Sequence, residues 1–283
     1  CLFSLSIMAL LSLAPAALSD NPLADDMFIR NWSITEPVAV AAATDMESQE
    51  KAFSTEPLEL TDLGASLAAG QVVIGEKSYA WKNLSSDSGI FDLVKELGAI
   101  EYCYVYAIAE VMSATDQQVL LGIGSDDGIK VWLNGQLIHE NFIGRAVNPD
   151  DDLVSAPFKS GSNSLILKIH NLQQGWGFCV RPLGQEKLTD RLAQAVNDGN
   201  MENVELLLAN GADPNQTIGP GLTPLHIATI RGRQGIVDLL LQSGADSQTP
   251  MPETTQIVDF LFERAIKENY PGASVLIAQD GKI

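Results

Sequence analysis

Apolar and polar residues alternate over short stretches in the part of the chain before residue 184, and Gly, Asp and Asn residues separate these stretches. Such alternation predicts half-buried β-strands, and the separating residues predict turns. The pair Asn134-Gly135 directly follows one stretch and predicts a tight hairpin. Many short antiparallel strands are typical of a β-sandwich, which we expect over residues 27–183. The predicted strands are 28–34, 101–111, 119–124, 129–134, 137–139, 164–171 and 177–180.

A different pattern follows, in which leucines recur at helical spacing and the whole segment repeats after 33 residues. Gly199–Asn215 has the sequence GNMENVELLLANGADPN, and Gly232–Gln248 has the sequence GRQGIVDLLLQSGADSQ. Thr223–Ala228 adds the hexapeptide TPLHIA. This period and this hexapeptide are characteristic of ankyrin repeats, and residues 187–250 resemble that family. The resemblance implies an α-helical stack of helix pairs.

Several residues of the repeat have roles that follow from their chemistry. Thr223 is expected to cap a helix that Pro224 begins, because proline is well suited to the first helical position. Gly211 and Gly244 are expected to end helices in the left-handed conformation. The ankyrin resemblance implies that His226 is structural and not catalytic.

The predicted stack is short. Asp190–Ala195 replaces the hexapeptide in the first repeat, as expected of a polar N-terminal cap. Leu206–Leu208 and Leu239–Leu241 are expected to form the buried faces of the second helices. Only two repeats are expected, whereas about three are usually needed for independent stability. The stack is therefore either a structural spacer between domains or a surface that binds a protein partner.

Charge excludes some partners. Acidic residues outnumber basic ones by 36 to 17, which gives a formal net charge of −19. A chain with this charge repels phosphate, so we expect neither nucleic acid nor an anionic membrane surface as a partner.

The N-terminal region has the features of an export signal. An apolar run from Leu2 to Leu13 precedes small residues at cleavage spacing, and it is too short for a stable membrane span. Residues 1–19 are therefore interpreted as a signal peptide remnant of an exported protein, periplasmic or extracellular; the alternative is a buried N-terminal helix. Cys103 and Cys179 lie in strand-like runs whose alternation favours two free thiols over a disulfide.

Motifs within residues 27–183 resemble the sugar-binding-like jelly-roll domains of exported bacterial enzymes. The resembling segments are Gly122–Gly135 (GIGSDDGIKVWLNG), Gly161–Lys168 (GSNSLILK) and Gly175–Phe178 (GWGF). The resemblance implies a jelly-roll β-sandwich and a glycan or cell-wall polymer as ligand.

The Ser125–Gly128 element also resembles protective-antigen-type lectin domains, in some of which paired aspartates hold Ca²⁺. Asp126 and Asp127 are therefore the candidate calcium ligands, and Asn134 or Asp150–Asp152 could add oxygens. The alternative is a simple turn with Gly128 at positive φ. Asp150–Asp152 is itself expected to be a solvated loop.

Tryptophans are candidates for sugar stacking. Trp176 lies between two glycines and is included among the candidate ligand-binding residues with Asp126, Asp127 and Asn134, while Trp81 and Trp132 are further candidates. The alternative for each tryptophan is packing in the core of the sandwich.

The C-terminal segment, residues 253–283, has a helical pattern, then Pro271-Gly272-Ala273, an apolar strand and an Asp-Gly-Lys turn. It resembles the start of the serine β-lactamase and penicillin-binding-protein superfamily and is expected to be a short α/β fragment. That family acylates the serine of a Ser-x-x-Lys motif, which does not occur at a comparable place here. No catalytic residue can therefore be assigned, and the motif is expected downstream of Ile283.

The sequence thus predicts a multidomain α+β chain with two alternative functions. The first is a non-catalytic binding and positioning region of an exported bacterial serine hydrolase of β-lactamase type. The second is a secreted or periplasmic binding protein, with a lectin-like sandwich and protein-binding ankyrin repeats, that has no enzymatic activity.

Overall fold

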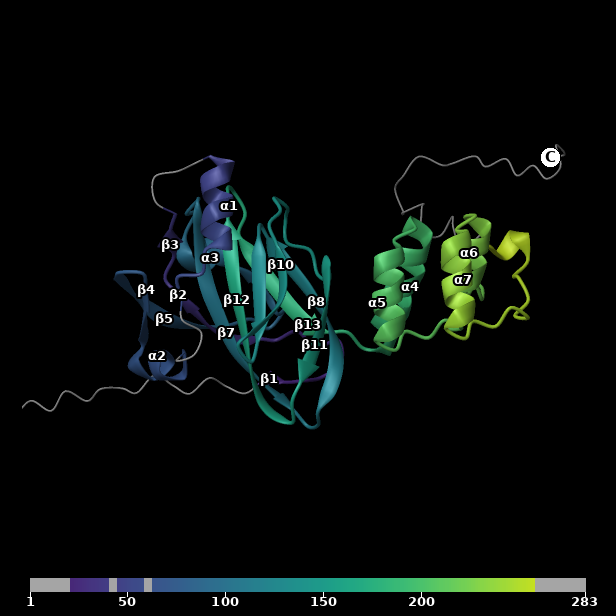
Figure 1. Cartoon of the computed structure of the whole chain (residues 1–283), viewed down its shortest axis with the longest axis horizontal. Coiled ribbons are helices and arrows are strands. Elements are labelled where there is room, and N and C mark those ends of the chain that lie inside the picture. Colours follow the sequence, from purple (N-terminus) through teal and green to yellow (C-terminus); the bar gives the residue numbers. More distant parts are fainter. Residues whose placement is uncertain (1–20, 41–44, 59–62, 258–283) are drawn as a thin grey trace, which may run out of the picture. The chain divides into compact units, whose positions relative to one another are not determined.

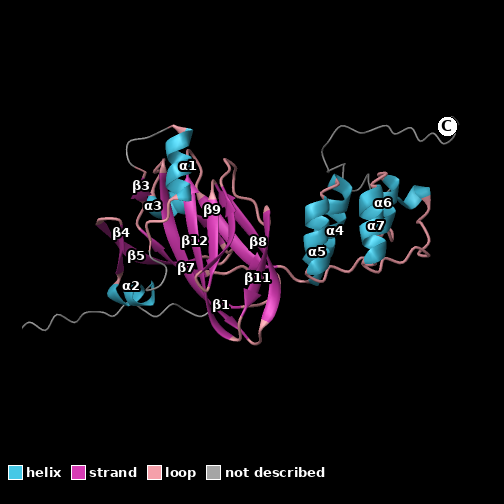
Figure 2. Cartoon of the chain, viewed as in Figure 1, coloured by secondary structure: helices cyan, strands magenta, loops and turns pink. Residues whose placement is uncertain are grey.

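The chain folds into two compact units with the boundary between Gly184 and Gln185. Strands dominate the first unit, and helices make up the second (Figures 1 and 2). The predicted signal peptide at residues 1–19 lies outside the described residues, as does most of the segment 253–283. The computed structural model describes residues 21–40, 45–58 and 63–257.

Within these residues, the first unit has two β-sheets. The larger sheet contains β1 (Asn21–Pro22), β2 (Asn31–Thr35), β3 (Val38–Ala39), β4 (Gln71–Ile74), β5 (Lys77–Ser85), β7 (Cys103–Ser113), β9 (Ile129–Leu133), β10 (Gln136–Asn141) and β12 (Gly161–Asn171). The smaller sheet contains β6 (Ile90–Asp92), β8 (Gln117–Asp126), β11 (Asp152–Phe158) and β13 (Gly177–Pro182).

The order of the strands is not their order in the chain. The larger sheet runs β10-β9-β12-β7-β2-β5-β4, with β1 and β3 also paired to β7, and the smaller sheet runs β11-β8-β13-β6. Neighbouring strands are antiparallel except β1, which pairs parallel with β7. The register of β9 and β10 confirms the predicted hairpin, because Leu133 faces Gln136 and both Asn134 and Gly135 have positive φ, 51° and 81°.

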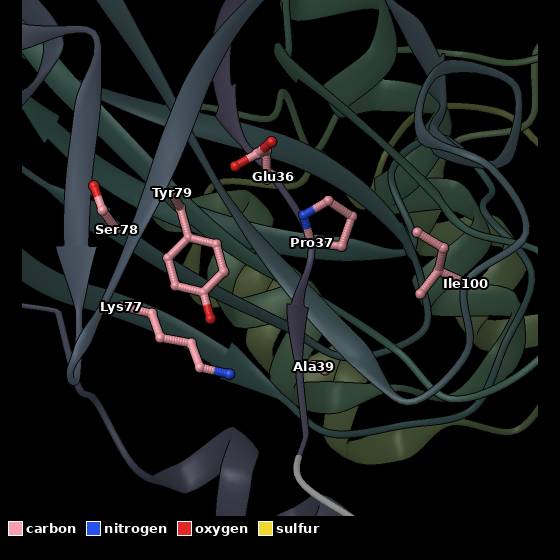
Figure 3. Close-up of a pocket in the computed structure, with 7 residues that line it drawn as sticks. All are labelled: Glu36, Pro37, Ala39, Lys77, Ser78, Tyr79 and Ile100. Atoms are coloured by element: carbon pink, nitrogen blue, oxygen red, sulfur yellow. The ribbon is translucent and has the colours of Figure 1, made fainter.

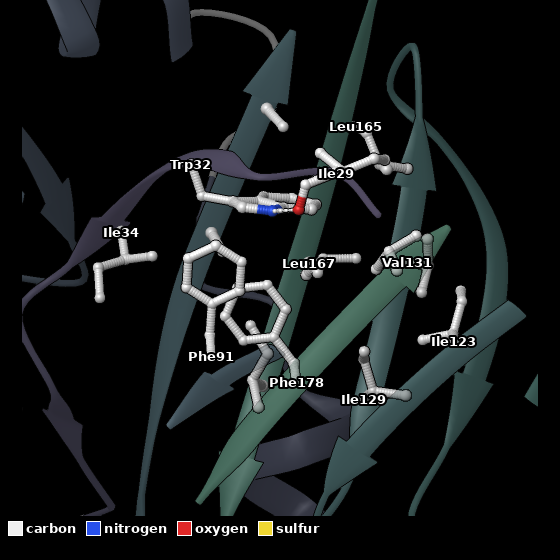
Figure 4. Close-up of a cluster of buried hydrophobic side chains, with 14 of the residues drawn as sticks. Ile29, Trp32, Ile34, Phe91, Ile123, Ile129, Val131, Leu165, Leu167 and Phe178 are labelled. Atoms are coloured by element: carbon white, nitrogen blue, oxygen red, sulfur yellow. Dashed lines mark hydrogen bonds between the residues drawn. The ribbon is translucent and has the colours of Figure 1, made fainter. Parts of the chain in front are cut away.

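Side chains from both sheets share one hydrophobic core (Figure 4). Val131 and Leu167 come from the larger sheet, while Ile123 and Phe178 come from the smaller one. Trp32 meets Phe178 edge to face, with ring centroids 5.3 Å apart, and its Nε1 donates a hydrogen bond of 3.0 Å to a backbone carbonyl. The alternating pattern of the sequence is thus explained by one shared core between two sheets.

The opposite face of the larger sheet is covered in part by the helix α1 (Met46–Ser54). Lys168 of β12 is fully buried there, and its Nζ donates to three backbone carbonyl oxygens at 2.7–3.2 Å around the C-terminal end of α1. Those carbonyls have no partner within the helix, so Lys168 satisfies them. Burial, partly offset by the charge of Glu56, lowers the pKa of Lys168 to about 8.

Two further helices complete this unit: α2 (Leu63–Ala69) and α3 (Leu93–Leu97). A second apolar cluster lies on the same outer face, where Leu63 and Val72 meet Tyr106 and Trp132. Within residues 45–58 and 63–70, the described residues form the helices α1 and α2 and no strand.

Within the described residues, the second unit contains α4 (Gln185–Asp198), α5 (Met201–Ala209), α6 (Pro224–Ile230) and α7 (Gln234–Gln242). Helix α4 contacts α5 and α6, and α7 contacts α6 and α5, so the two helix pairs stack side by side (Figure 1). The prediction that each leucine triplet is buried is wrong in part. Leu207 and Leu240 are fully buried, whereas Leu241 is 43% exposed. Three consecutive helical residues span about 200° of the helix circumference, so they do not all face one core.

Candidate functional site

The ankyrin hexapeptide begins α6 with a reciprocal cap. The Oγ1 atom of Thr223 accepts from the backbone N–H of His226, and Nδ1 of His226 accepts from the backbone N–H of Thr223, both at 3.2 Å. Pro224 occupies the first turn. The predictions for Thr223 and Pro224 are therefore confirmed, and the cap satisfies two backbone donors that the helix leaves open.

His226 joins this cap to the next loop. Because its Nδ1 is an acceptor, its Nε2 carries the proton and donates to the carbonyl oxygen of Thr249 at 3.1 Å. The ring is thus engaged on both sides within the stack, as the ankyrin resemblance implies for a structural histidine. Gly211 and Gly244 have φ of 90° and 92°, so both helix-ending predictions are confirmed.

A short antiparallel bridge holds the loop between α5 and α6. Ile218 and Leu222 exchange two backbone hydrogen bonds of 2.9 and 3.1 Å. Gly219 and Gly221 have φ of 53° and 106°, which the tight turn between them requires. The loop therefore presents a fixed shape at one end of the helices.

The first helices of the two repeats, α4 and α6, both carry exposed side chains. On α4, Asp190 and Gln194 are exposed, and Ile227 of α6 lies 33 positions after Gln194. Ile230 ends α6 with 56% of its surface exposed. The stack therefore offers apolar side chains beside polar ones on its first helices, a mixture typical of protein-binding surfaces.

The charge of the stack is acidic. Residues 185–257 contain nine acidic and four basic side chains. Sequence reasoning identified the repeat but missed Ile230 as a surface residue. The signal was available, because the position 33 residues earlier is the polar Asn197.

The first unit holds the predicted calcium ligands at the corner between β8 and β9. Oδ1 of Asp127 accepts from the backbone N–H of Arg145 at 3.1 Å, and Oδ2 accepts from that of Leu172 at 2.6 Å. The peptide bond between Asp126 and Asp127 is cis. Burial, and then the charge of Asp127, raises the pKa of Asp126 to about 6. The two neighbouring carboxylates therefore repel each other at neutral pH.

The side chains at this corner offer few free oxygens to a calcium ion. Ca²⁺ takes about six to eight oxygens. Asp126 and Asp127 supply two carboxylates, and both oxygens of Asp127 already accept N–H bonds. Within the described ranges, no group of three or more His, Cys, Asp or Glu side chains is arranged to hold a metal. The side chains present thus do not complete a calcium shell, and calcium binding stays a prediction.

The turn alternative needs a correction at Gly128. This glycine is not among the residues with positive φ. A Cβ atom there would instead lie 3.2 Å from the ring of Phe142 and 3.3 Å from that of Phe53. Gly128 is therefore explained by the close approach of two aromatic rings.

The structure separates Asn134 from the calcium corner. Asn134 follows β9, at the opposite end of that strand from Asp127. Its Nδ2 donates to Asn163 at 2.9 Å, and its Oδ1 accepts from the backbone N–H of Ser164 at 3.0 Å. Asn134 therefore fixes the hairpin turn, and its assignment as a ligand beside Asp126 is not supported by its position.

The ring of Trp176 is not accessible for stacking on a sugar. Trp176 is 2% exposed and belongs to the shared core, and its backbone oxygen accepts from Leu93 at 2.8 Å. The glycines beside it let the backbone pass closely, because a Cβ on Gly177 would lie 2.5 Å from a carbonyl oxygen of Phe91. Trp132 is buried as well, at 5% exposure, but in the apolar cluster on the outer face of the larger sheet. Packing in the core of the sandwich is therefore correct for Trp176 and not for Trp132.

The solvated-loop interpretation of Asp150–Asp152 is wrong at two of its three residues. Asp150 is 3% exposed and forms an ion pair of 2.5 Å with Arg181. Asp152 is 8% exposed and pairs with Arg145. Burial alone would raise the pKa of Asp152, but hydrogen bonds from His139 and Arg145 outweigh it and hold the pKa well below its usual range.

Cys103 and Cys179 are both buried and unpaired, which confirms the prediction of two free thiols. Burial raises the pKa of each thiol to about 12. Neither is therefore suited to act as a nucleophile near neutral pH. Among the described helices, none is long and apolar enough to cross a bilayer.

Comparisons with known proteins concern the helical part. Residues 190–278 match the family model described as ankyrin repeats in three copies, so the family model counts one repeat more than the two expected from the sequence pattern. Protein phosphatase 1 regulatory subunit 27 of Homo sapiens is 47% identical over 55 residues, which are 19% of this chain and 36% of that protein. The same identity and shares hold for its counterpart in Mus musculus.

A further relative is the Notch-regulated ankyrin repeat-containing protein B of Danio rerio. It is 40% identical over 77 residues, which are 26% of this chain and 68% of that protein. The chain thus spans about a third of the length of the two phosphatase subunits but more than two thirds of the fish protein. The capped helices, the repeat period and these matches agree, and the chain therefore belongs to the ankyrin-repeat family through the segment that begins at residue 190.

Proposed function

We propose that the chain binds a protein partner through the exposed side of α4 and α6 and the loop between α5 and α6. The observation that carries this proposal is the 56% exposure of Ile230, on a helix that also carries the half-buried Ile227. The equivalent of Ile227 on α4 is the exposed Gln194. Contact between an exposed isoleucine and water is unfavourable. Covering the side chain with a partner therefore contributes favourably to the free energy of binding. One relative is named as a regulatory subunit of another protein, protein phosphatase 1, which supports a role exercised on a partner.

The charge of the stack suggests the character of the partner. Nine acidic side chains against four basic ones in residues 185–257 favour a surface with exposed Lys and Arg. Electrostatic attraction of this kind acts mainly on the association rate, and it weakens as salt increases.

The test uses the whole chain as bait in three forms. The wild type is compared with Ile230→Glu and with Met201→Glu, which adds the same charge at a residue of α5 that is 36% exposed. We expect a partner that is captured by the wild type and by Met201→Glu but lost with Ile230→Glu. Equal capture by all three forms, or no partner of the wild type, would contradict the proposal.

Three further proposals, on the first unit and on export, rest on the resemblances found in the sequence. We propose that the two-sheet unit is a jelly roll, that the protein is exported, and that its second ligand is a glycan or cell-wall polymer. The serine hydrolase proposal rests on residues 253–283 alone, most of which the ankyrin family model also covers. Hydrolysis of a chromogenic β-lactam by a protein extended past Ile283 would support it, and a third ankyrin repeat in that segment without such activity would favour the pure binding protein.

A further inference from the structure

A pocket of about 380 Å³ opens on the outer face of the larger sheet (Figure 3). Tyr79 from β5 forms one wall, and Pro37, Ala39 and Ile100 form the apolar remainder. Tyr79 packs in part against the outer apolar cluster, away from the core that the two sheets share. The volume lies within the range of roughly 300–1,000 Å³ that is usual for small-molecule sites.

Two charged side chains line the same pocket. Oε2 of Glu36 accepts from the backbone N–H of Ala80 at 3.0 Å, and the backbone N–H of Glu36 donates to the carbonyl oxygen of Ala80 at 3.0 Å. These two bonds fix Glu36 on the edge of β5, and they leave Oε1 without a partner among the described residues. Lys77 begins β5 and is exposed, so its ammonium group can donate into the pocket.

The chemistry of these groups points to a class of ligand. An ionised carboxylate only accepts hydrogen bonds, and an ammonium group only donates them. Sugar hydroxyls do both, so one ring can satisfy Glu36 and Lys77 at once. The C–H face of such a ring fits against the Tyr79 ring and the apolar wall. An anionic ligand would meet the charge of Glu36 in a chain of net charge −19.

We propose that this pocket binds a neutral pyranose sugar, with Tyr79 as the stacking ring, Glu36 as acceptor and Lys77 as donor. This inference gives a site to the glycan proposed above and rests on that proposal, but it does not depend on partner binding by the ankyrin stack. The site shares no residue with the corner of Asp126 and Asp127. It needs no metal, because all three groups act directly on the sugar.

Saturation-transfer NMR and calorimetry on the whole chain test the proposal. The probes are the methyl glycosides of glucose, galactose, mannose and N-acetylglucosamine, each with calcium and with EDTA. Tyr79→Ala removes the ring, whereas the matched variant Tyr79→Phe keeps it. Glu36→Gln keeps an acceptor for Ala80 but removes the charge, and Lys77→Met removes the donor. Asp126→Asn tests whether the sugar binds instead at the corner of Asp126 and Asp127.

We expect at least one glycoside to bind in EDTA, with affinity unchanged in Asp126→Asn and with tighter binding to Tyr79→Phe than to Tyr79→Ala. Tyr79→Ala should weaken binding about tenfold, a loss typical of one stacked ring. Lys77→Met and Glu36→Gln should each weaken it as well. Binding that requires calcium and is lost in Asp126→Asn would overturn the proposal, as would the absence of binding by all four glycosides. Melting curves of each variant exclude unfolding as the cause of a loss.

Discussion

Asn215 ties the loop of the first repeat to the loop of the second through the backbone around Asp246. Its Oδ1 accepts from the backbone N–H of Asp246 at 2.6 Å, and its Nδ2 donates to the carbonyl oxygen of Gly244 at 2.9 Å. Both amide functions of one side chain are thus used between repeats. Each repeat contacts only its neighbours. Such a link therefore contributes directly to the free energy of the interface between the two repeats.

We therefore expect Asn215→Ala to destabilise the helical unit by about 1–2 kcal/mol, because two backbone groups lose their partner. Urea denaturation followed by circular dichroism at a helical wavelength measures the change. Asn203→Ala, on the helix α5, is the matched control and should change stability by less than about 0.5 kcal/mol. Equal losses for both variants would show that Asn215 has no special role between the repeats.

The cap of α6 gives a second prediction. Thr223→Ala removes the hydroxyl that accepts from His226 and should cost about 1 kcal/mol of unfolding free energy. Thr223→Ser keeps that hydroxyl and should retain most of the stability. If the serine variant were as unstable as the alanine variant, the methyl group and not the hydrogen bond would be the important feature.

The raised pKa of Asp126 leads us to expect that the stability of the protein depends on pH. The pKa of Asp126 is raised from 3.8 to about 6 in the folded state, so between about pH 4 and pH 6 the folded chain binds more protons than the unfolded chain. Its contribution therefore makes the protein less stable as pH rises through this window. Asp126→Asn should raise the unfolding free energy by about 1 kcal/mol above pH 6 and have little effect near pH 4.

This comparison is made by thermal melting in EDTA, so that a cation does not compensate the repulsion between Asp126 and Asp127. Addition of Ca²⁺ to the wild type then tests the calcium hypothesis separately. A rise in melting temperature that is absent in Asp126→Asn would support it. A variant that is destabilised at both pH values would contradict the assignment of the raised pKa to a carboxylate under repulsion.

The buried Lys168 gives a fourth prediction. Lys168→Met leaves three carbonyl oxygens around the end of α1 without their donor, and we expect a loss of about 2–4 kcal/mol. Lys159→Met makes the same chemical change at a lysine whose side chain is 67% exposed, and it should be nearly neutral. Chemical denaturation followed by tryptophan fluorescence compares them. Similar losses in both would mean that Lys168 does not hold α1 to the sheet.

The sequence by itself determined the features that depend on local chemistry and period. The 33-residue repeat, the Thr223 cap, the glycine helix ends and the Asn134-Gly135 hairpin all follow from the conformational preferences of a few neighbouring residues. The alternation of apolar residues likewise predicted strands over 101–111 and 164–171, where the structure has β7 and β12.

Tertiary structure decided the features that depend on which distant residues meet. The sequence left Trp176 open between a presented ring and core packing, and it predicted a solvated Asp150. The structure places Trp176 in the shared core and pairs Asp150 with Arg181, 31 residues away. Lys168 meets the end of α1 across more than 110 residues, and Tyr79 and Glu36 line one pocket only because β2 pairs with β5. A single sequence records propensity and period, whereas burial and charge pairing are set by strand order, which no local pattern contains.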